Sequence, residues 1–252
     1  MNEQYYSPRR FSILPPVVKN LLIINGLFFL ASLAFRNIFK MDIDDILGLH
    51  YFQSELFYPH QLITYMFMHG GFGHIFFNMF ALWMFGNTIE NYWGGKKFLL
   101  YYLITGIGAA LTQELVYGIQ LYQLASQMSP EMIDMVKTEG LETLKQGLNY
   151  TDTLMGNYNR LLNATTVGAS GSVFGILLAF GMIFPNTLIY IYFLFPIKAK
   201  WFVIIYGAIE LYYGFSSTND GIAHFAHLGG MIFGLILILL WKKRNRNIYE
   251  YY

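Results

Sequence analysis

Ser170 is the residue with the clearest potential for covalent chemistry. It stands in Gly168-Ala169-Ser170-Gly171 at the start of an apolar stretch that runs to Phe184, and a second apolar stretch near the C-terminus carries His224 and His227. A serine hydroxyl becomes a nucleophile when an imidazole accepts its proton. A serine and a histidine on separate membrane-length segments therefore predict peptide-bond cleavage inside a lipid bilayer.

A packing role is the simpler interpretation of that tetrapeptide taken alone. Small residues line helix contacts in membranes, and Ser172 stands where soluble hydrolases with a G-x-S-x-G turn have their second glycine. Gly230 and Gly234 form another small-residue pair at GxxxG spacing, just after His227. We expect this pair to pack against the helix that begins near Ser170, which would bring the serine and the histidine together.

Two histidines compete for the role of base. His227 lies one turn before Gly230, beside the expected helix contact, whereas His224 is nearer the helix end and has a structural alternative. At i,i+3 spacing the two could also bind a metal ion together. The absence of an H-E-x-x-H motif, and of a carboxylate deep in any expected span, argues against this. We therefore expect neither a metal nor a cofactor.

His74 and Asn78 are four residues apart in an apolar stretch and so share one face of a helix. Two donors aimed at one point can stabilise an oxyanion, and loss of one such donor typically raises the barrier by about 3 to 4 kcal/mol. Interhelical hydrogen bonding is the structural alternative for either residue alone. His69 stands five residues before His74, and either points elsewhere or precedes the helix.

The composition is that of an integral membrane protein. Hydrophobic residues make up 55% of the chain and charged residues 12%, and the mean hydropathy is +0.40, which leaves too little polar surface for a water-soluble domain. A formal charge of +1 gives no indication of nucleic-acid binding. The lack of cysteine excludes disulfides, thiolate metal sites and a cysteine nucleophile.

Six segments are long and apolar enough to predict membrane-spanning helices, and together they predict an all-α, polytopic bundle. They cover residues 17–35, 62–89, 98–118, 167–184, 201–215 and 222–241. The start of the fifth span is open, because residues 187–195 are also apolar and Pro196-Ile197-Lys198-Ala199-Lys200 interrupts them. The first segment follows Arg9 and Arg10 without a small-residue cleavage site, and we interpret it as a retained span.

The distribution of Lys and Arg predicts the orientation. With the N-terminus inside, eleven of these residues fall on the inner side and five on the outer side, as the positive-inside rule requires. The basic cluster at Lys242-Lys243-Arg244-Asn245-Arg246 then lies in the cytoplasm. Residues 36–60 and 119–165 form long outer connections; the first could lie in the membrane interface as an amphipathic element. Ser129-Pro130-Glu131 predicts a helix start within the second.

These motifs together resemble the rhomboid family of intramembrane serine proteases. The resemblance rests on His69, His74 and Asn78 in an H-x4-H-x3-N pattern, on Gly168-x-Ser170-Gly171, and on Ala226-His227-x-x-Gly230-x-x-x-Gly234, in that order on the second, fourth and sixth spans. Glu90, Gly94, Phe98-Leu99 and Tyr102 are similar to the family's loop into the third span. The match covers residues 10–118 and 165–241 of a single rhomboid-like membrane domain, residues 1–252. Residues 119–165, an extracytoplasmic insertion between spans 3 and 4, depart from the compact family pattern.

The resemblance implies a role for each of these residues. Ser170 would be the nucleophile and His227 the general base and later general acid, a dyad without a carboxylate. His74, Asn78 and the backbone amide of Ser170 would form the oxyanion hole. Phe174 takes the place where the family often has a tyrosine against the catalytic imidazole, and supporting roles are open for His224 and His69. The implied substrates are single-span membrane proteins, cut near the outer end of a helix that unwinds easily.

Two other functions stay open. A catalytically inactive rhomboid-like protein that binds membrane clients is expected to lack the serine or the histidine, and both are present here. A transporter or channel would line its path with charged pairs, whereas these spans contain few charges. The expected location is a bacterial inner membrane with both termini cytoplasmic. The expected partners are transmembrane proteins and the bilayer, with neither nucleic acid nor metal.

Overall fold

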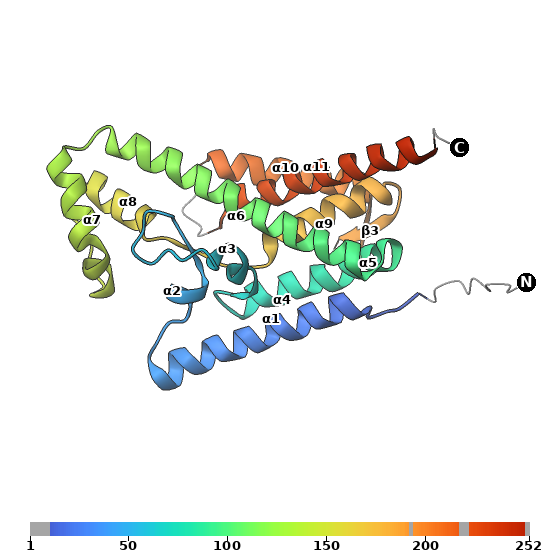
Figure 1. Cartoon of the computed structure of the whole chain (residues 1–252), viewed down its shortest axis with the longest axis horizontal. Coiled ribbons are helices and arrows are strands. Elements are labelled where there is room, and N and C mark those ends of the chain that lie inside the picture. The colour runs from blue at the N-terminus through green and yellow to red at the C-terminus, as the bar shows by residue number, and fades with distance from the viewer. Residues whose placement is uncertain (1–10, 192–193, 217–221, 250–252) are drawn as a thin grey trace, which may run out of the picture.

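Long helices packed side by side form the body of the protein, and shorter helices gather at one end (Figure 1). The structure, a computed structural model, describes residues 11–191, 194–216 and 222–249. Within that part of the chain, three segments are long and apolar enough to cross a membrane: Pro16–Phe39, Gly95–Ala125 and His224–Lys243. Arg9 and Arg10, which contribute to the predicted orientation, lie outside the described residues.

The other three expected spans hold helices that do not combine this length with this hydropathy. α4 (Phe72–Ala81), a π-helical turn η3 (Leu82–Gly86) and α5 (Asn87–Trp93) follow one another without a break. α9 (Ser170–Ile183) has 14 residues, and α10 (Ala199–Phe215) has 17. All six expected positions therefore hold helices, but among the described residues three of these helices have spanning length and hydropathy. The count of six membrane crossings stays a prediction.

The predicted span 62–89 is wrong at its start. α3 (Gln61–Thr64) and a single 3-10 turn, η2 (Tyr65–Phe67), are separated from α4 by residues 68–71. Gly70 and Gly71 lie in this break, and glycine costs a helix conformational entropy that other residues do not. His69 therefore lies outside the helix that carries His74 and Asn78.

The first helix, α1 (Pro16–Ala34), begins beside a carboxylate of another helix. Glu90 of α5 accepts hydrogen bonds from the backbone amides of Val17 and Val18, at 2.9 and 2.7 Å. The first amides of a helix have no partner within it, and a negative charge at this end interacts favourably with the helix dipole. Glu90 thus joins the start of α1 to α5.

Three helices form the centre of the bundle: α6 (Gly95–Ala125), α9 and α11 (His224–Tyr249), with α11 packed along both of the others. Their core contains large buried aromatic residues of α6, among them Phe98. Tyr101 Oη donates to Gly175 O at 2.8 Å, and Ser172 Oγ donates to Tyr102 O at 2.7 Å. These buried hydrogen bonds hold α6 against α9.

The two small residues of α11 contact different helices. A side chain on Gly230 would collide with the backbone of Gly171, so α11 meets α9 at this position as expected. A side chain on Gly234 would instead collide with Tyr101 of α6. The expectation that both glycines face the fourth span is wrong for Gly234, because α6 covers that face of α11 one turn further along.

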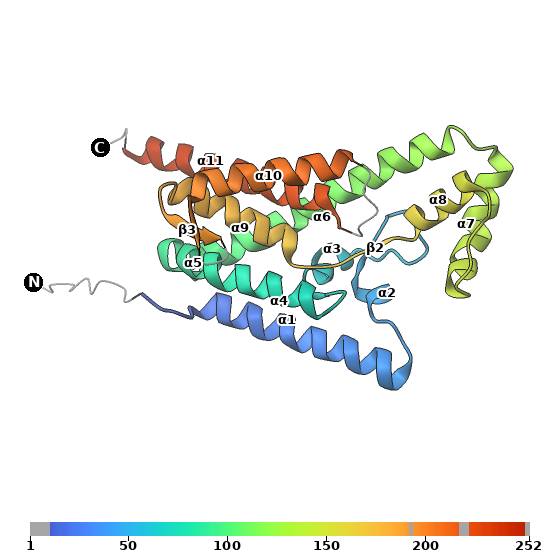
Figure 2. The same cartoon turned by 180° about the vertical axis from the view of Figure 1, so that it is seen from behind.

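The region between α6 and α9 holds two helices at one end of the molecule, here called the α7–α8 end (Figure 2). α7 (Pro130–Lys145) has Ser129 as its N-cap, with the hydroxyl accepting from the Met132 amide at 3.3 Å, and the predicted helix start is confirmed. α8 (Thr153–Leu162) begins after Asp152, whose carboxylate accepts from the Met155 amide at 2.9 Å. The start of α1 and the end of α11 lie at the opposite end (Figure 1).

Residues 36–60 form the other connection at the α7–α8 end. η1 (Phe35–Phe39) continues α1 as a π-helical turn, and α2 (Asp44–Leu47) follows it. β1 (Leu49–His50) then pairs antiparallel with β2 (Thr165–Thr166), the segment that leads into α9. This pairing links the two long connections next to the start of α9.

A hairpin that was not expected from the sequence comes before α10. β3 (Leu188–Ile191) pairs antiparallel with β4 (Phe195–Lys198), with Leu188 opposite Lys198 and Ile191 opposite Phe195. β-Branched and aromatic residues favour such strands. The fifth helix therefore begins at Ala199, after the proline, which settles the start that the sequence left open.

Candidate active site

Ser170 is the first residue of α9, directly after the turn from β2 into the helix. Gly168 in that turn has φ of 127°, a backbone conformation that side-chain-bearing residues rarely adopt. A Cβ at Gly168 would also lie 2.7 Å from His74 Nε2 and 3.6 Å from Ser170 Oγ. The glycine therefore allows the backbone before Ser170 to approach the His74 ring.

The β1–β2 pair holds this segment in place. His50 of β1 is fully buried, and burial lowers the pKa of its imidazole, so the ring is neutral at neutral pH. Its Nδ1 lies 3.5 Å from Thr165 Oγ1, and the Gly168 amide donates to Tyr65 O at 2.9 Å. β1 and η2 thus both fix the segment that runs from β2 to Ser170.

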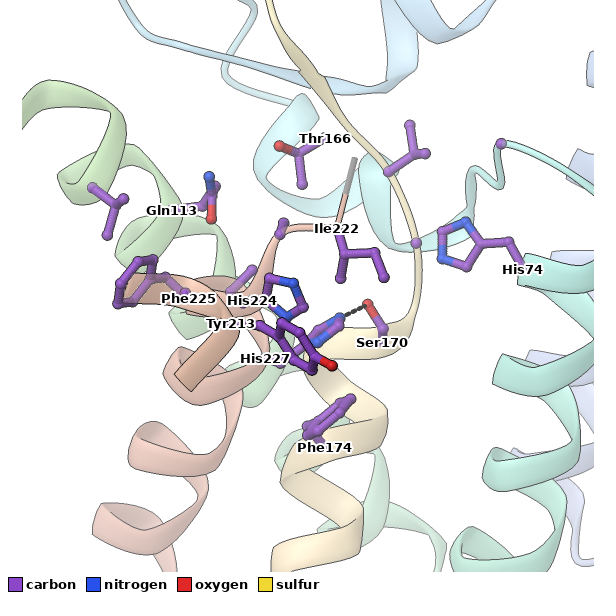
Figure 3. A pocket seen from close by; sticks show the side chains of 18 of the residues that line it. His74, Gln113, Thr166, Ser170, Phe174, Tyr213, Ile222, His224, Phe225 and His227 are labelled. Carbon is purple, nitrogen blue, oxygen red and sulfur yellow. Dashed lines mark hydrogen bonds between the residues drawn. The ribbon is translucent and has the colours of Figure 1, made fainter. Parts of the chain in front are cut away.

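The structure brings the Ser170 hydroxyl within 2.8 Å of His227 Nε2 (Figure 3). The two side chains come from α9 and α11, which approach closely where Gly230 meets Gly171. Phe174, one turn after Ser170, stacks on the His227 ring with centroids 4.2 Å apart and planes at 7°. A hydrogen bond at one edge and an aromatic ring on one face therefore hold the imidazole in a single orientation.

A buried carboxylate contacts the other edge of the same imidazole. Glu210 of α10 is 6% exposed, and its Oε2 lies 2.8 Å from His227 Nδ1 and 2.7 Å from His224 Nδ1. Glu210 is not among the site residues expected from the sequence. The expectation that no carboxylate lies deep in a span is wrong, because Glu210 falls within 201–215 and Glu114 within 98–118. The available signal was the cost of a carboxylate in a membrane, which marks such a residue as a functional candidate.

His224 contacts the same carboxylate oxygen as His227. Its ring stacks on Tyr213 of α10, with centroids 5.6 Å apart, and meets the His227 ring edge to face at 6.3 Å. Of the two histidines that the sequence left in competition, His227 is the one hydrogen-bonded to Ser170. Both share one oxygen of Glu210.

Glu210, His224 and His227 also form a group that could hold a metal by composition, with ligand atoms within 4.8 Å of one another. Zinc bound at about 2.0 to 2.1 Å in tetrahedral geometry would hold its ligand atoms about 3.3 Å apart. The distances from Glu210 Oε2 to the two Nδ1 atoms, 2.8 and 2.7 Å, are those of hydrogen bonds. The arrangement fits two N–H donors on one carboxylate oxygen better than it fits metal ligands.

His74 and Asn78 line the same cavity as Ser170 from the facing helix α4. Figure 3 shows the His74 ring pointing from α4 toward the side of Ser170. Asn78 Nδ2 donates one proton to the His74 backbone carbonyl at 2.9 Å, and its second proton is left for another acceptor. Two donor side chains therefore face the serine across the cavity.

His69 contacts His74 but is not among the described residues that line the cavity. It is 2% exposed, and its ring meets the His74 ring edge to face with centroids 5.1 Å apart. In the described part of the chain neither ring nitrogen has a hydrogen-bond partner. Its contact with the site is through His74.

A cavity of about 1350 Å³ is lined by Ser170, His227, His74 and Asn78, among other residues. Apolar residues of η3 and α10, such as Met84 and Phe202, line the part that extends into the bundle. Polar residues of α6 and α8, such as Gln120 and Arg160, line the part toward the α7–α8 end. The cavity thus offers an apolar wall and a polar wall on either side of Ser170.

Known proteins match most of this chain. The family profile described as "Rhomboid domain" matches residues 57–124 and 144–244. The sequence is 24% identical over 235 residues, 93% of the chain, to "RHOMBOID-like protein 12, mitochondrial" of Arabidopsis thaliana. It is 27% identical over 192 residues, 73% of the chain, to "Rhomboid-like protein 11, chloroplastic" of the same plant.

The chain spans 60% and 53% of the lengths of these two plant relatives. A shorter stretch of 51 residues, 20% of the chain and 10% of the relative, is 39% identical to "Rhomboid protease GluP" of Bacillus subtilis (strain 168). The second matched segment of the family profile contains Ser170, Glu210 and His227. The histidine and asparagine of α4 lie within the first.

Proposed function

The chain belongs to the rhomboid family, and from that premise we propose that it is an intramembrane serine endopeptidase. The observation that carries this proposal is the distance of 2.8 Å between Ser170 Oγ and His227 Nε2. A hydroxyl and an imidazole at this distance are the minimum needed to make a serine nucleophilic. The protein is a multi-pass membrane protein, so its substrate must reach this pair from within a bilayer or at its surface.

In the proposed reaction, Ser170 Oγ attacks the scissile carbonyl carbon while His227 Nε2 accepts the hydroxyl proton. The C–N bond then breaks as His227 returns that proton to the departing amine, which leaves Ser170 acylated. A water molecule gives a proton to His227, its oxygen displaces Ser170 Oγ, and the serine regains its proton. Ser170 is half-buried and lines the cavity, which supports access for both the peptide and water.

We propose that His74, Asn78 and the Ser170 backbone amide stabilise the oxyanion. Ser170 is the first residue of α9, where backbone amides lack partners within the helix and the dipole favours negative charge. The His74 ring lies next to Gly168, and Asn78 keeps one amide proton for an acceptor. Donors of this kind are each worth about 10² to 10³ in kcat.

The proposed substrates are membrane proteins with a transmembrane segment. The apolar wall between α4 and α10 supports entry of a helix from the side, and the polar wall supports contact with the segment beyond it. The backbone groups of a helix are paired with one another, so the cut bond must lie where the helix can unwind. Ser170 is the first residue of α9, and His227 lies in the first turn of α11. Both helices begin on the side of the α7–α8 end, which favours cleavage near that end of the substrate (Figure 2).

We propose that residues 1–252 form one membrane domain in which residues 119–165 lie outside the cytoplasm and both termini inside it. The positive-inside distribution supports this orientation, since the α7–α8 end lies opposite the start of α1 and the end of α11. The bacterial cell membrane stays the proposed location. The names of the two plant relatives make a membrane of an organelle the competing one.

A protein that binds membrane clients without cleaving them is the competing function, since both plant relatives are named only as rhomboid-like. A binder needs no hydrogen bond between a serine and a histidine. The presence of Ser170 and His227 at bonding distance therefore supports the protease.

Cleavage by purified protein in lipid vesicles decides between these functions. The substrate is a model single-span protein with a small residue near the outer end of its helix. Parent protein should cleave it, and Ser170→Ala should not. Ser172→Ala is the matched control, because Ser172 lies on the same helix but donates to Tyr102 O and does not line the cavity. Equal cleavage by the parent and Ser170→Ala would refute the protease.

A further inference from the structure

We propose that Glu210 is a positioning residue for His227, so that the site is a Ser170–His227–Glu210 triad whose carboxylate is held by His224. This inference rests on the proposed function, because it gives the serine–histidine pair a third member. The family resemblance implies a dyad without a carboxylate, and Glu210 departs from that expectation. The proposal stands on the contacts of a single oxygen atom.

The hydrogen bonds of His227 fix its proton. A neutral imidazole has one N–H donor and one acceptor nitrogen. If Nε2 is to accept the Ser170 proton, Nδ1 must carry the ring proton, and Nδ1 lies 2.8 Å from Glu210 Oε2. The carboxylate therefore selects the tautomer that the proposed chemistry needs.

Burial makes that carboxylate effective. Glu210, His224 and His227 are all buried, so little solvent separates the negative charge from the imidazole. When His227 takes the serine proton it becomes positive, and a negative charge 2.8 Å from Nδ1 stabilises it. Glu210 keeps its negative charge in this step, and the proton stays on His227.

His224 helps to hold the Glu210 carboxylate in place. Its Nδ1 lies 2.7 Å from the same Oε2. Its ring stacks on Tyr213, which lies three residues after Glu210 on α10. His224 and His227 are at i,i+3 on α11 and so face the same side. Two N–H donors from one helix thus hold the Glu210 side chain of α10 in one position. The two histidines therefore have different roles. His227 accepts the Ser170 proton, and His224 orients Glu210.

The test uses full-length protein in lipid vesicles with the single-span substrate. Glu210→Gln keeps the size of the side chain and removes its charge. We expect kcat to fall about 10² to 10⁴-fold with KM changed less than about threefold, as when a triad carboxylate is made neutral. Glu210→Asp, which keeps the charge, should recover part of kcat.

Glu114→Gln is the matched control. Glu114 is a carboxylate within α6 that accepts from the Phe52 amide at 2.9 Å and does not line the cavity. It should leave kcat and KM within about twofold of the parent. Dialysis against a chelator should likewise leave cleavage unchanged. Loss of activity on chelation, restored by zinc, would overturn the hydrogen-bonded triad in favour of a metal at these residues.

A second measurement does not depend on activity. Nitrogen-15 chemical shifts of the imidazoles, assigned with His224→Gln and His227→Gln, report which ring nitrogen carries the proton. We expect Nδ1–H for both rings in the parent, and a changed tautomer balance in both rings in Glu210→Ala. Cleavage that needs Ser170 but is unchanged in Glu210→Gln would refute the triad and leave the protease standing. Parent protein that cleaves nothing, with Nδ1–H rings that respond to Glu210→Ala, would refute the protease and leave the carboxylate contacts standing.

Discussion

The molecule contains two pairs of neighbouring histidines whose surroundings differ; three of the four rings are buried, and His74 is half-buried. The rings of His69 and His74 meet edge to face at 5.1 Å, and no carboxylate hydrogen bond to either ring is found in residues 11–191. The rings of His224 and His227 share a carboxylate oxygen at 2.7 and 2.8 Å. The surroundings of the first pair therefore favour neutral rings that donate hydrogen bonds. The surroundings of the second pair favour a ring that accepts a proton.

This difference follows from the presence or absence of a carboxylate, because the protein interior screens charges poorly. A buried imidazolium without a counter-charge is costly, so the first pair is suited to donating a hydrogen bond without titrating. A neighbouring carboxylate offsets that cost, so the second pair is suited to accepting a proton. Contact with Glu210, more than the spacing of the histidines along a helix, therefore decides whether a histidine is suited to act as a base or as an oxyanion donor.

His227→Gln should have the largest effect. Glutamine can keep a hydrogen bond but cannot accept a proton at neutral pH, so we expect cleavage to fall by at least about 10³-fold. The measurement is kcat for the single-span substrate in vesicles, with the thermal midpoint as a check on folding. A variant that keeps a tenth of the parent's rate would show that His227 is no base, and the contrast between the pairs would disappear.

His74→Gln and His74→Ala sharpen the other side of the comparison. If His74 acts only as a donor, alanine should lower kcat about 10² to 10³-fold and glutamine should recover part of that loss. The ratio of the two rates is the measurement. Equal losses for both variants would mean that His74 does more than donate, and would bring the first pair closer to the second.

Asn78→Ala removes a second donor from the facing helix. We expect kcat to fall about 10 to 10²-fold, less than for His74, because Asn78 Nδ2 already donates to the His74 carbonyl and only its second proton is available. The variant is compared with His74→Ala and with the double variant. A double variant whose loss is the product of the single losses would argue against a shared oxyanion site.

His69→Leu should have the smallest effect. His69 is buried with no hydrogen-bond partner for either ring nitrogen in the described residues, so an apolar side chain of similar size removes an unsatisfied group. We expect kcat within about threefold of the parent and a thermal midpoint that is unchanged or higher. A large loss of activity would reveal a contact of His69 with the reaction that the geometry does not suggest.

The sequence predicted the parts of the site that carry local motifs. Ser170 at the start of a helix, His227 one turn before Gly230, and the close contact of Gly230 with α9 all follow from short-range spacing. The cap at Ser129 followed from the same kind of signal. Such features depend on neighbours within one or two turns, which a sequence displays directly.

The features that the sequence did not predict depend on long-range packing. Glu210 is a single carboxylate with no motif around it, and its meaning comes from α11, 14 residues further along the chain. Gly234 faces α6 because of how three helices cross, which the GxxxG pattern does not encode. The spacing of His69 and His74 left open whether His69 precedes the helix, and the break at residues 68–71 is fixed only in the folded chain.

Labelling by a serine-reactive phosphonate tests the central pairing of Ser170 with His227 most directly. Parent protein in vesicles should be labelled, and labelling should be lost in Ser170→Ala and in His227→Ala. His224→Ala should still be labelled, at a rate lowered about 10 to 10²-fold because Glu210 loses one of its two donors. Labelling that survives in His227→Ala and is lost in His224→Ala would contradict the pairing and assign the base to His224.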